Sequence, residues 1–190
     1  METTLYIKNM VCDRCIRVVN EELSKLGYEV KNVSLGEAVI NSGKKEVDLD
    51  EIKKTLVNNG FDLVNDLNSR LIEKIKVLII DKIHRQNDKL EKFSFSKYLS
   101  NELGVNYSHL SSVFSSCEST TIEKFIIKQK IEKVKELLTY DELTLSEIAY
   151  KLGYSSVQHL SNQFKQITGL NPSFFKKVKE KRRMPLDHLD

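Results

Sequence analysis

The sequence is poor in the two residues that most often interrupt regular structure. Only 7 glycines and 2 prolines occur among its 190 residues. This scarcity excludes collagen-like, proline-rich and low-complexity classes, and it disfavours a turn-rich all-β fold. Long apolar runs are missing as well, since no stretch approaches the roughly 18 residues that span a bilayer, so we expect no membrane insertion. The first residues show no secretory signal pattern.

Cysteine is also scarce, and three cysteines cannot build a disulfide framework. Without an export signal we expect a cytoplasmic protein, in whose reducing compartment closely spaced cysteines are typical of metal or redox sites. Charge is divided unevenly: residues 1–66 carry 9 basic and 12 acidic side chains, whereas residues 67–190 carry 21 and 15. This asymmetry predicts two units with different partners, with nucleic acid as a candidate partner of the basic one.

The hydrophobic pattern of residues 3–64 predicts alternating strands and helices. A strand around Leu5 and Ile7 is followed by a helix that ends at Gly27, and then by two strands over 30–35 and from 38 onward. A second helix with Asp50 as its cap, and a last strand over 61–64, complete the order βαββαβ. This order is typical of a ferredoxin-like domain.

Two cysteines, Cys12 and Cys15, lie between the first strand and the first helix. A helix N-terminus favours thiolates, and two sulfurs without further ligands suit a soft ion of low coordination number, Cu(I) above all. Ag(I), Hg(II), Zn(II) and Cd(II) stay open. Redox exchange by this CxxC pair is an alternative, and so is a domain kept only for protein contacts.

With Met10 the motif reads M-x-C-x-x-C after a strand and at the start of a helix. In this setting the N-terminal unit resembles the heavy-metal-associated domain of copper chaperones and P-type metal ATPases. The resemblance implies that Cys12 and Cys15 are the metal ligands and that Met10 is a buried anchor of the loop. It also implies that a metal chaperone or a metal ATPase domain is a candidate partner. Asn9 departs from the family, which usually has Gly there.

From Leu67 onward the pattern is helical, beginning with a long apolar stripe that extends to Ile83. An internal repeat follows at an offset of 50 residues, and it matches segment 108–114 to segment 158–164. Each copy is preceded by a helix and a glycine-containing turn, which predicts two helix-turn-helix units joined by a helix over about 122–138. The fold class is therefore α+β, with a ferredoxin-like domain over 1–66 and an all-α double helix-turn-helix domain with a basic tail over 67–190.

The second copy runs from Leu145 to Lys176 and closes with Gly169-Leu170-Asn171-Pro172 and two phenylalanines. This half resembles the DNA-binding domain of AraC/XylS transcription regulators, which implies that double-stranded DNA is its partner. The paired leucines and phenylalanines of the repeat are expected in the core, and His109 and His159 in structural or DNA-backbone roles. The candidate DNA-binding residues are Ser108, Ser111, Ser112, Ser155, Ser156, Val157, Gln158, Ser161, Asn162, Lys165, Lys176 and Lys177, with the tail over 179–183 as a further phosphate contact.

The predicted recognition helices contain no arginine, so bidentate arginine–guanine contacts are excluded. Gln158 and Asn162 suit adenine, and Val157 suits a thymine methyl group. We therefore expect a DNA-binding transcription regulator, not an enzyme, that responds to a thiophilic metal ion. The alternative is a metal-delivery or docking protein whose DNA binding is constitutive.

Overall fold

The structure is a computed structural model that describes residues 2–43, 46–64, 66–86, 90 and 93–182; for 178–182 only the backbone is described. Its chain folds into two compact units. The first comprises Met1–Asp81 and Leu99–Ser119, and the second comprises Lys82–Tyr98 and Thr120–Asp190. The predicted domain boundary at residue 66 stays a prediction, and segment Leu99–Ser119 of the first predicted helix-turn-helix lies in the same compact unit as the N-terminal sheet.

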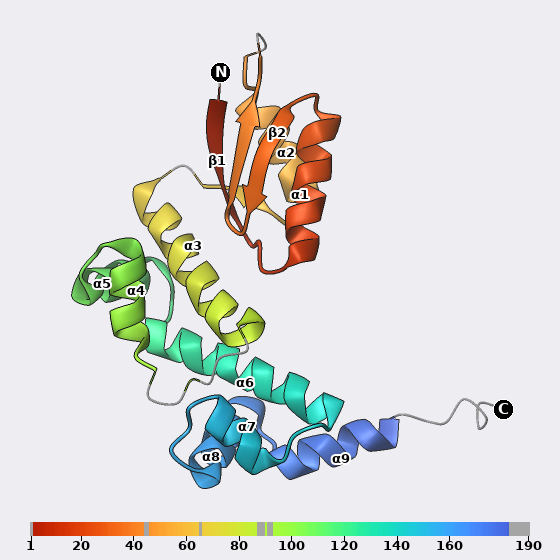
Figure 1. The fold of residues 1–190 in the computed structure, drawn as a ribbon, viewed down its shortest axis with the longest axis vertical. Helices are drawn as coiled ribbons and strands as arrows, with labels where there is room; N and C mark the ends of the chain where they lie inside the picture. Colours follow the sequence, from red (N-terminus) through yellow and green to blue (C-terminus); the bar gives the residue numbers. More distant parts are fainter. Residues whose placement is uncertain (1, 44–45, 65, 87–89, 91–92, 183–190) are drawn as a thin grey trace, which may run out of the picture. The chain divides into compact units, whose positions relative to one another are not determined.

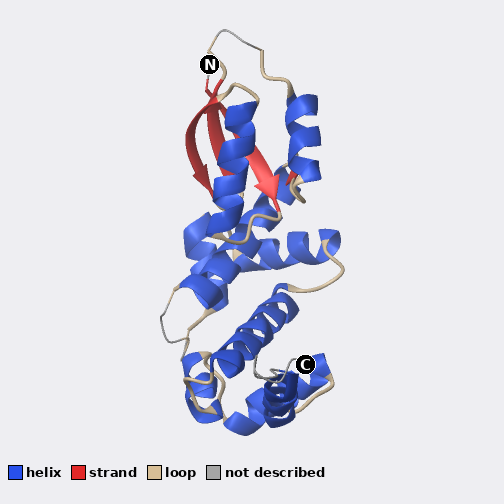
Figure 2. Cartoon of the chain, turned by 90° about the vertical axis from the view of Figure 1, so that its right-hand side faces the viewer, coloured by secondary structure: helices blue, strands red, loops and turns tan. Residues whose placement is uncertain are grey.

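The first unit begins with the predicted order of strands and helices, and every strand in the described ranges lies there (Figures 1 and 2). The elements are β1 (Glu2–Lys8), α1 (Asp13–Lys25), β2 (Glu29–Ser34), β3 (Glu37–Asn41), α2 (Leu49–Asn58) and β4 (Asp62–Leu63). They form a sheet in the order β2-β3-β1-β4, and each neighbouring pair is antiparallel.

One face of this sheet forms a hydrophobic core with α1 and α2. Leu5 and Ile7 alternate with exposed or half-buried residues along β1, so one face of the strand is buried. They pack with Ala38 and Ile40 of β3 and with apolar side chains of both helices. The cap predicted for the second helix was wrong: Asp48, not Asp50, accepts the N–H of Glu51 at 2.9 Å. Asp50 lies inside the first turn, where its carboxylate cannot act as the N-cap.

The remainder is helical, as the repeat predicted (Figure 2). The first unit continues with α3 (Leu67–Ile80), the C-terminal part of α4 (Phe95–Leu103), and α5 (Tyr107–Cys117). The long helix predicted through Ile83 is interrupted, because a π-helical turn spans Asp81–Arg85. The second unit contains α6 (Ile122–Tyr140), α7 (Leu145–Lys151), α8 (Val157–Thr168) and α9 (Pro172–Arg182).

Corresponding positions of the two repeats are buried, each in its own unit. Leu110 and Phe114 of α5 are fully buried, and so are Leu160 and Phe164 of α8. In the second unit the ring of Phe164 also packs edge-to-face on Phe175 of α9, with 5.5 Å between the centroids. The repeat is therefore a repeat of core positions, which leaves the other faces of α5 and α8 for partners. No helix in the described part of the chain could cross a membrane.

Candidate metal site and nucleic-acid interface

Two cysteine thiols lie at the start of helix α1. Cys12 is the N-cap residue, and Cys15 follows within the first turn, so their Sγ atoms are 3.4 Å apart. Cys12 is exposed and Cys15 is half-buried. The pair is accessible from solvent and close enough for both sulfurs to contact one ion.

The helix start favours the thiolate form of Cys12. The backbone N–H of Cys15 and then the Cys15 thiol hydrogen-bond to the Cys12 sulfur and lower its pKa, and the backbone N–H of Arg14 adds to this effect. Partial burial and the carboxylate of Asp13 raise the pKa by less. A lowered thiol pKa increases the fraction of thiolate, which is the form that binds metal ions.

The loop before the thiols is anchored on both sides. Met10 is 2% exposed and therefore packs in the core, as the resemblance implied. Asn9 has a φ of +71°, in the left-handed region, and its Nδ2 donates to the carbonyl of Gly60 at 3.1 Å. Asparagine tolerates this conformation better than most residues. The departure from glycine at this position is thus compatible with the turn and adds a hydrogen bond.

Among the residues that the structure describes, no three His, Cys, Asp or Glu side chains gather in a group that could hold a metal ion. Two sulfurs suit a soft ion of low coordination number better than structural zinc, which usually takes four ligands.

On α5 the predicted base-contacting residues are serines, and local hydrogen bonds involve several hydroxyls and carbonyls of this helix. Ser108 and Ser112 are exposed and Ser111 is half-buried. The hydroxyl of Ser108 donates to the side chain of the N-cap residue Asn106 at 2.9 Å. The carbonyl oxygens of Ser111 and Ser112 accept from the hydroxyl of Ser115 at 2.8 and 3.2 Å. The helix therefore presents short hydroxyls and no charged side chain, and the hydroxyls of Ser108, Ser115 and Ser116 donate to local acceptors.

On α8 the predicted residues form a more distinctive surface. Ser156 is the N-cap and accepts the N–H of His159 at 3.0 Å. Gln158 and Asn162, one turn apart, are joined by a hydrogen bond from Nε2 to Oδ1 of 2.8 Å. Both amides are exposed, as are Ser155 and Val157, whereas Ser161 is half-buried. This surface presents two coupled amides beside an apolar side chain.

The predicted phosphate-contacting lysines differ in their surroundings. Lys165 and Lys177 are exposed, and neither pairs with an acidic side chain in the described ranges. Lys176 is half-buried and forms an ion pair with Asp141, the left-handed C-cap residue of α6. In the basic tail, Arg183 lies outside the described residues, and the side chains of 179–182 are not described.

Beside α8, one group was not predicted, the ammonium of Lys130. The hydroxyl of Ser155 lies 3.0 Å from Nδ1 of His159, and the imidazole packs edge-to-face on Tyr154. The ammonium of Lys130 lies 5.4 Å from the centroid of the Tyr154 ring, and burial lowers the pKa of this lysine. Burial also raises the pKa of Tyr154. These contacts surround the turn before α8, and local sequence patterns carry no signal for the Lys130 contact because Lys130 is remote in the chain.

Comparison with known proteins gives matches for the C-terminal part of the chain. A family model described as a helix-turn-helix domain matches residues 99–177. An uncharacterised HTH-type transcriptional regulator of Staphylococcus aureus (strain MSSA476) is 30% identical over 105 residues, which are 53% of this chain and 14% of the relative. The probable transcriptional regulator LumQ of Photobacterium leiognathi is 24% identical over 102 residues, 54% of this chain and 40% of the relative. The chain thus spans less than half the length of either curated relative, and the proteins it matches are transcription regulators, not enzymes.

Solved structures show the same fold. The C-terminal domain of AraT, a response regulator from Geobacillus stearothermophilus, superposes with a TM-score of 0.51 at 22% identity, covering 66% of this chain and 95% of that domain. A transcriptional regulator of Chromobacterium violaceum with an AraC-type DNA-binding domain gives 0.51 at 16% identity, covering 62% and 100%. Residues 99–177 therefore match a helix-turn-helix domain, and the fold is the one seen in these solved structures. The family match begins after α3 and does not bear on Cys12 and Cys15.

Proposed function

We propose that this chain is a sequence-specific DNA-binding transcription regulator of the cytoplasm that responds to a thiophilic metal ion. The helix-turn-helix match over residues 99–177 carries the DNA-binding part of the proposal, and we propose that this domain is of the AraC type. The exposed amide pair of α8 supports sequence-specific readout, since amides fit the donor and acceptor groups on the adenine edge. Lys165, Lys177 and, after release from its ion pair, Lys176 would contact phosphates and supply affinity.

The metal part of the proposal rests on the thiol pair. We propose a ferredoxin-like, heavy-metal-associated domain, supported by the sheet order β2-β3-β1-β4 and by the burial of Met10. Cys12 and Cys15 would hold Cu(I) as two thiolates, with Ag(I), Hg(II), Zn(II) and Cd(II) as competitors for the same sulfurs. The ion would supply the signal, and the protein would supply a thiolate of lowered pKa at an anchored loop.

The test of metal binding uses Cu(I) alone under anaerobic reducing conditions with a competing chelator. We expect one equivalent of Cu(I) per wild-type chain and none for the double variant Cys12→Ser/Cys15→Ser. Cys117→Ser is the matched control, because Cys117 is exposed at the end of α5 and is expected to leave the stoichiometry unchanged. Unchanged binding by the double variant would exclude this site.

The test of DNA binding is selection from randomised duplexes, followed by footprinting of the selected site. We expect two protected half-sites about one helical turn, roughly 10 base pairs, apart. Adding Cu(I) is expected to change the affinity for this site in the wild type and not in the double cysteine variant.

One observation favours a second candidate function. Val11, beside Cys12, is 48% exposed, so the metal loop presents an apolar side chain to solvent. Such a surface suits docking with a metal chaperone or a metal ATPase domain. In a metal-delivery protein of this kind, Cu(I) would pass to the partner while the affinity for DNA stayed constant.

A further inference from the structure

Within the first compact unit, the strand that leads to the thiols and the end of the first recognition helix meet at one cavity. Lys8 and Asn9, which precede the thiol loop, line an open and mainly polar cavity of about 440 Å³. Cys117 and Glu118, where α5 ends, line the same cavity. The two candidate functional elements of this unit are therefore neighbours in space, although more than 100 residues separate them in the sequence.

Lys76 of α3 bridges this region. Its Nζ lies 2.7 Å from Oε1 of Glu118 and 3.0 Å from Oε1 of Glu73, and its side chain is 23% exposed. Burial lowers the pKa of Lys76, but the hydrogen bonds to Glu118 and Glu73 outweigh it, so the net pKa is raised and the ammonium stays charged at neutral pH. Glu118 is the C-cap residue of α5, and its N–H donates to the carbonyl of Phe114. Lys76 thus ties the end of α5 to α3.

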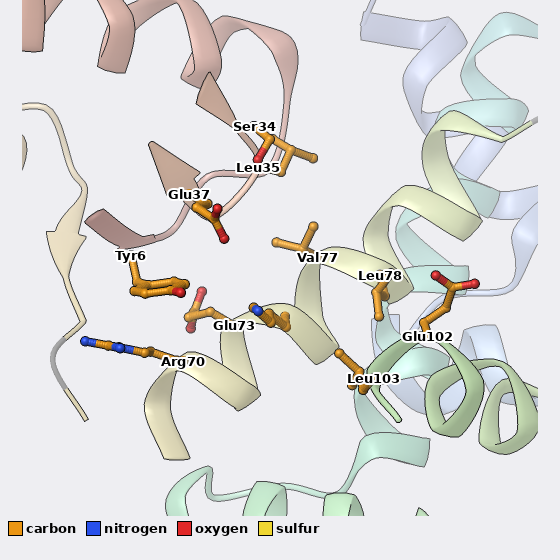
Figure 3. A pocket seen from close by; sticks show the side chains of 12 residues that line it. Tyr6, Ser34, Leu35, Glu37, Arg70, Glu73, Val77, Leu78, Glu102 and Leu103 are labelled. Carbon is orange, nitrogen blue, oxygen red and sulfur yellow. The ribbon is translucent and has the colours of Figure 1, made fainter. Parts of the chain in front are cut away.

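The same helix α3 packs on the sheet strand that leads to the thiols. The guanidinium of Arg70 stacks over the ring of Tyr6 of β1, 4.3 Å from its centroid. Figure 3 shows these two side chains lying near each other. Farther along α3, Val77 lies beside Gly36, where a Cβ would be in ordinary van der Waals contact with Cγ2 of the valine at 3.5 Å. Helix α3 therefore contacts both the strand that enters the thiol loop and, through Lys76, the end of α5.

We propose that Lys76 is a positioning residue that couples metal capture at Cys12 and Cys15 to the DNA affinity of α5. An ion that joins the two thiolates restricts the loop beginning at Asn9, and this residue borders the cavity that Lys76 and Glu118 also line. A change in the loop is thereby passed to the end of α5 through the ion pair with Glu118. The inference rests on the proposed function, and it names the residue that carries the response.

Coupling between two binding sites is reciprocal, so it can be measured from either side. In the wild type we expect saturating Cu(I) to change the Kd for the selected DNA site by about 5-fold or more. In Lys76→Met, and independently in Glu118→Gln, we expect this change to fall below about 2-fold, while the Kd for Cu(I) alone stays at the wild-type value. Lys76→Arg keeps the charge and is expected to retain the response. Lys53→Met, an exposed lysine on α2 of the same unit, is the matched control.

The outcomes separate the inference from the proposed function. If wild type responds to Cu(I), and Lys76→Met and Glu118→Gln respond equally well, the coupling role of Lys76 is wrong and the proposed function stands. If wild type binds Cu(I) and DNA with no mutual effect, the metal response and the inference both fail, while DNA binding stands. If wild type does not bind Cu(I), the metal site and the coupling are overturned together. Loss of the response in both variants, with recovery in Lys76→Arg, supports the inference.

Discussion

The amide pair of α8 allows a quantitative test of direct base readout. Nε2 of Gln158 donates to Oδ1 of Asn162, which leaves one lone pair of that oxygen and both Nδ2 hydrogens available to a base. An asparagine with these groups available can accept from N6 and donate to N7 of one adenine. The Gln158 amide would hold the Asn162 amide in the orientation that this contact requires.

The magnitude follows from the loss of one bidentate contact. Removing it costs about 1–3 kcal/mol, which corresponds to a roughly 5- to 150-fold loss of affinity for the selected site. Asn162→Ala is expected to show this loss and to relax one base position. An amide pair one turn apart stabilises a helix by only about 0.2–0.5 kcal/mol, so neither variant should unfold α8. Gln158→Ala is expected to lose part of the same contact, because Asn162 is then no longer oriented.

The assay measures DNA affinity in a double-mutant cycle of Gln158→Ala and Asn162→Ala. Each protein is titrated with the selected DNA site and with a second site that differs only at the base position that Asn162→Ala is expected to relax. Because both residues act on one contact, the double variant should lose less than the sum of the single losses, with a coupling energy of about 0.5 kcal/mol or more. Gln163→Ala is the matched control, since this amide lies five residues and about 140° around the helix from Gln158. Additive losses, with the wild-type consensus recovered from all variants, would refute the reasoning and favour readout of DNA shape.

Three other expectations follow from the contacts. Replacing Cys15 by Ala removes a thiol that lowers the pKa of Cys12, so the pH midpoint for alkylation of Cys12, measured by mass spectrometry, should rise. In the wild type, the affinity for Cu(I) should fall as the pH drops through this midpoint, because protons then compete with the ion for the sulfur. Lys177→Ala should weaken binding to all DNA sequences alike and lower the slope of log affinity against log salt concentration by about 1. Lys176→Ala should have a smaller effect, because the ammonium of Lys176 is already paired with Asp141. Titrations of DNA binding with salt distinguish the two variants. Thr121→Ala removes the N-cap of α6, whose Oγ1 accepts the N–H of Lys124 at 3.3 Å, and should lower the free energy of unfolding in urea by about 1 kcal/mol.

Local periodicity predicted the element order and the core of the repeat, because burial of one helix face leaves a pattern in consecutive residues. The leucines at 110 and 160 and the phenylalanines at 114 and 164 are buried as that pattern indicated. The cap of α2 was misplaced by two residues because two aspartates precede the same apolar stripe, and only the hydrogen bond to Glu51 distinguishes them.

Long-range pairing lay beyond prediction from local pattern. Lys176 and Asp141 are 35 residues apart, and Lys76 and Glu118 are 42 apart, so neither pair leaves a periodic signal. For this reason the sequence predicted that Lys176 contacts phosphate but did not predict its ion pair with Asp141. It likewise carried no sign that α5 would pack in the same compact unit as the sheet.

Because α5 and α8 belong to different compact units, they should unfold in different cooperative steps. Helix α5 packs on α3, which in turn contacts β1 of the sheet, whereas α8 packs with α6, α7 and α9. Regions that pack together tend to open together as one cooperative unit. Helix α5 should therefore lose its hydrogen-exchange protection together with the N-terminal unit that holds the thiols rather than with α8, the helix that repeats its sequence. A metal ion that stabilises the sheet would then also protect α5 from opening, while α8 would exchange at an unchanged rate.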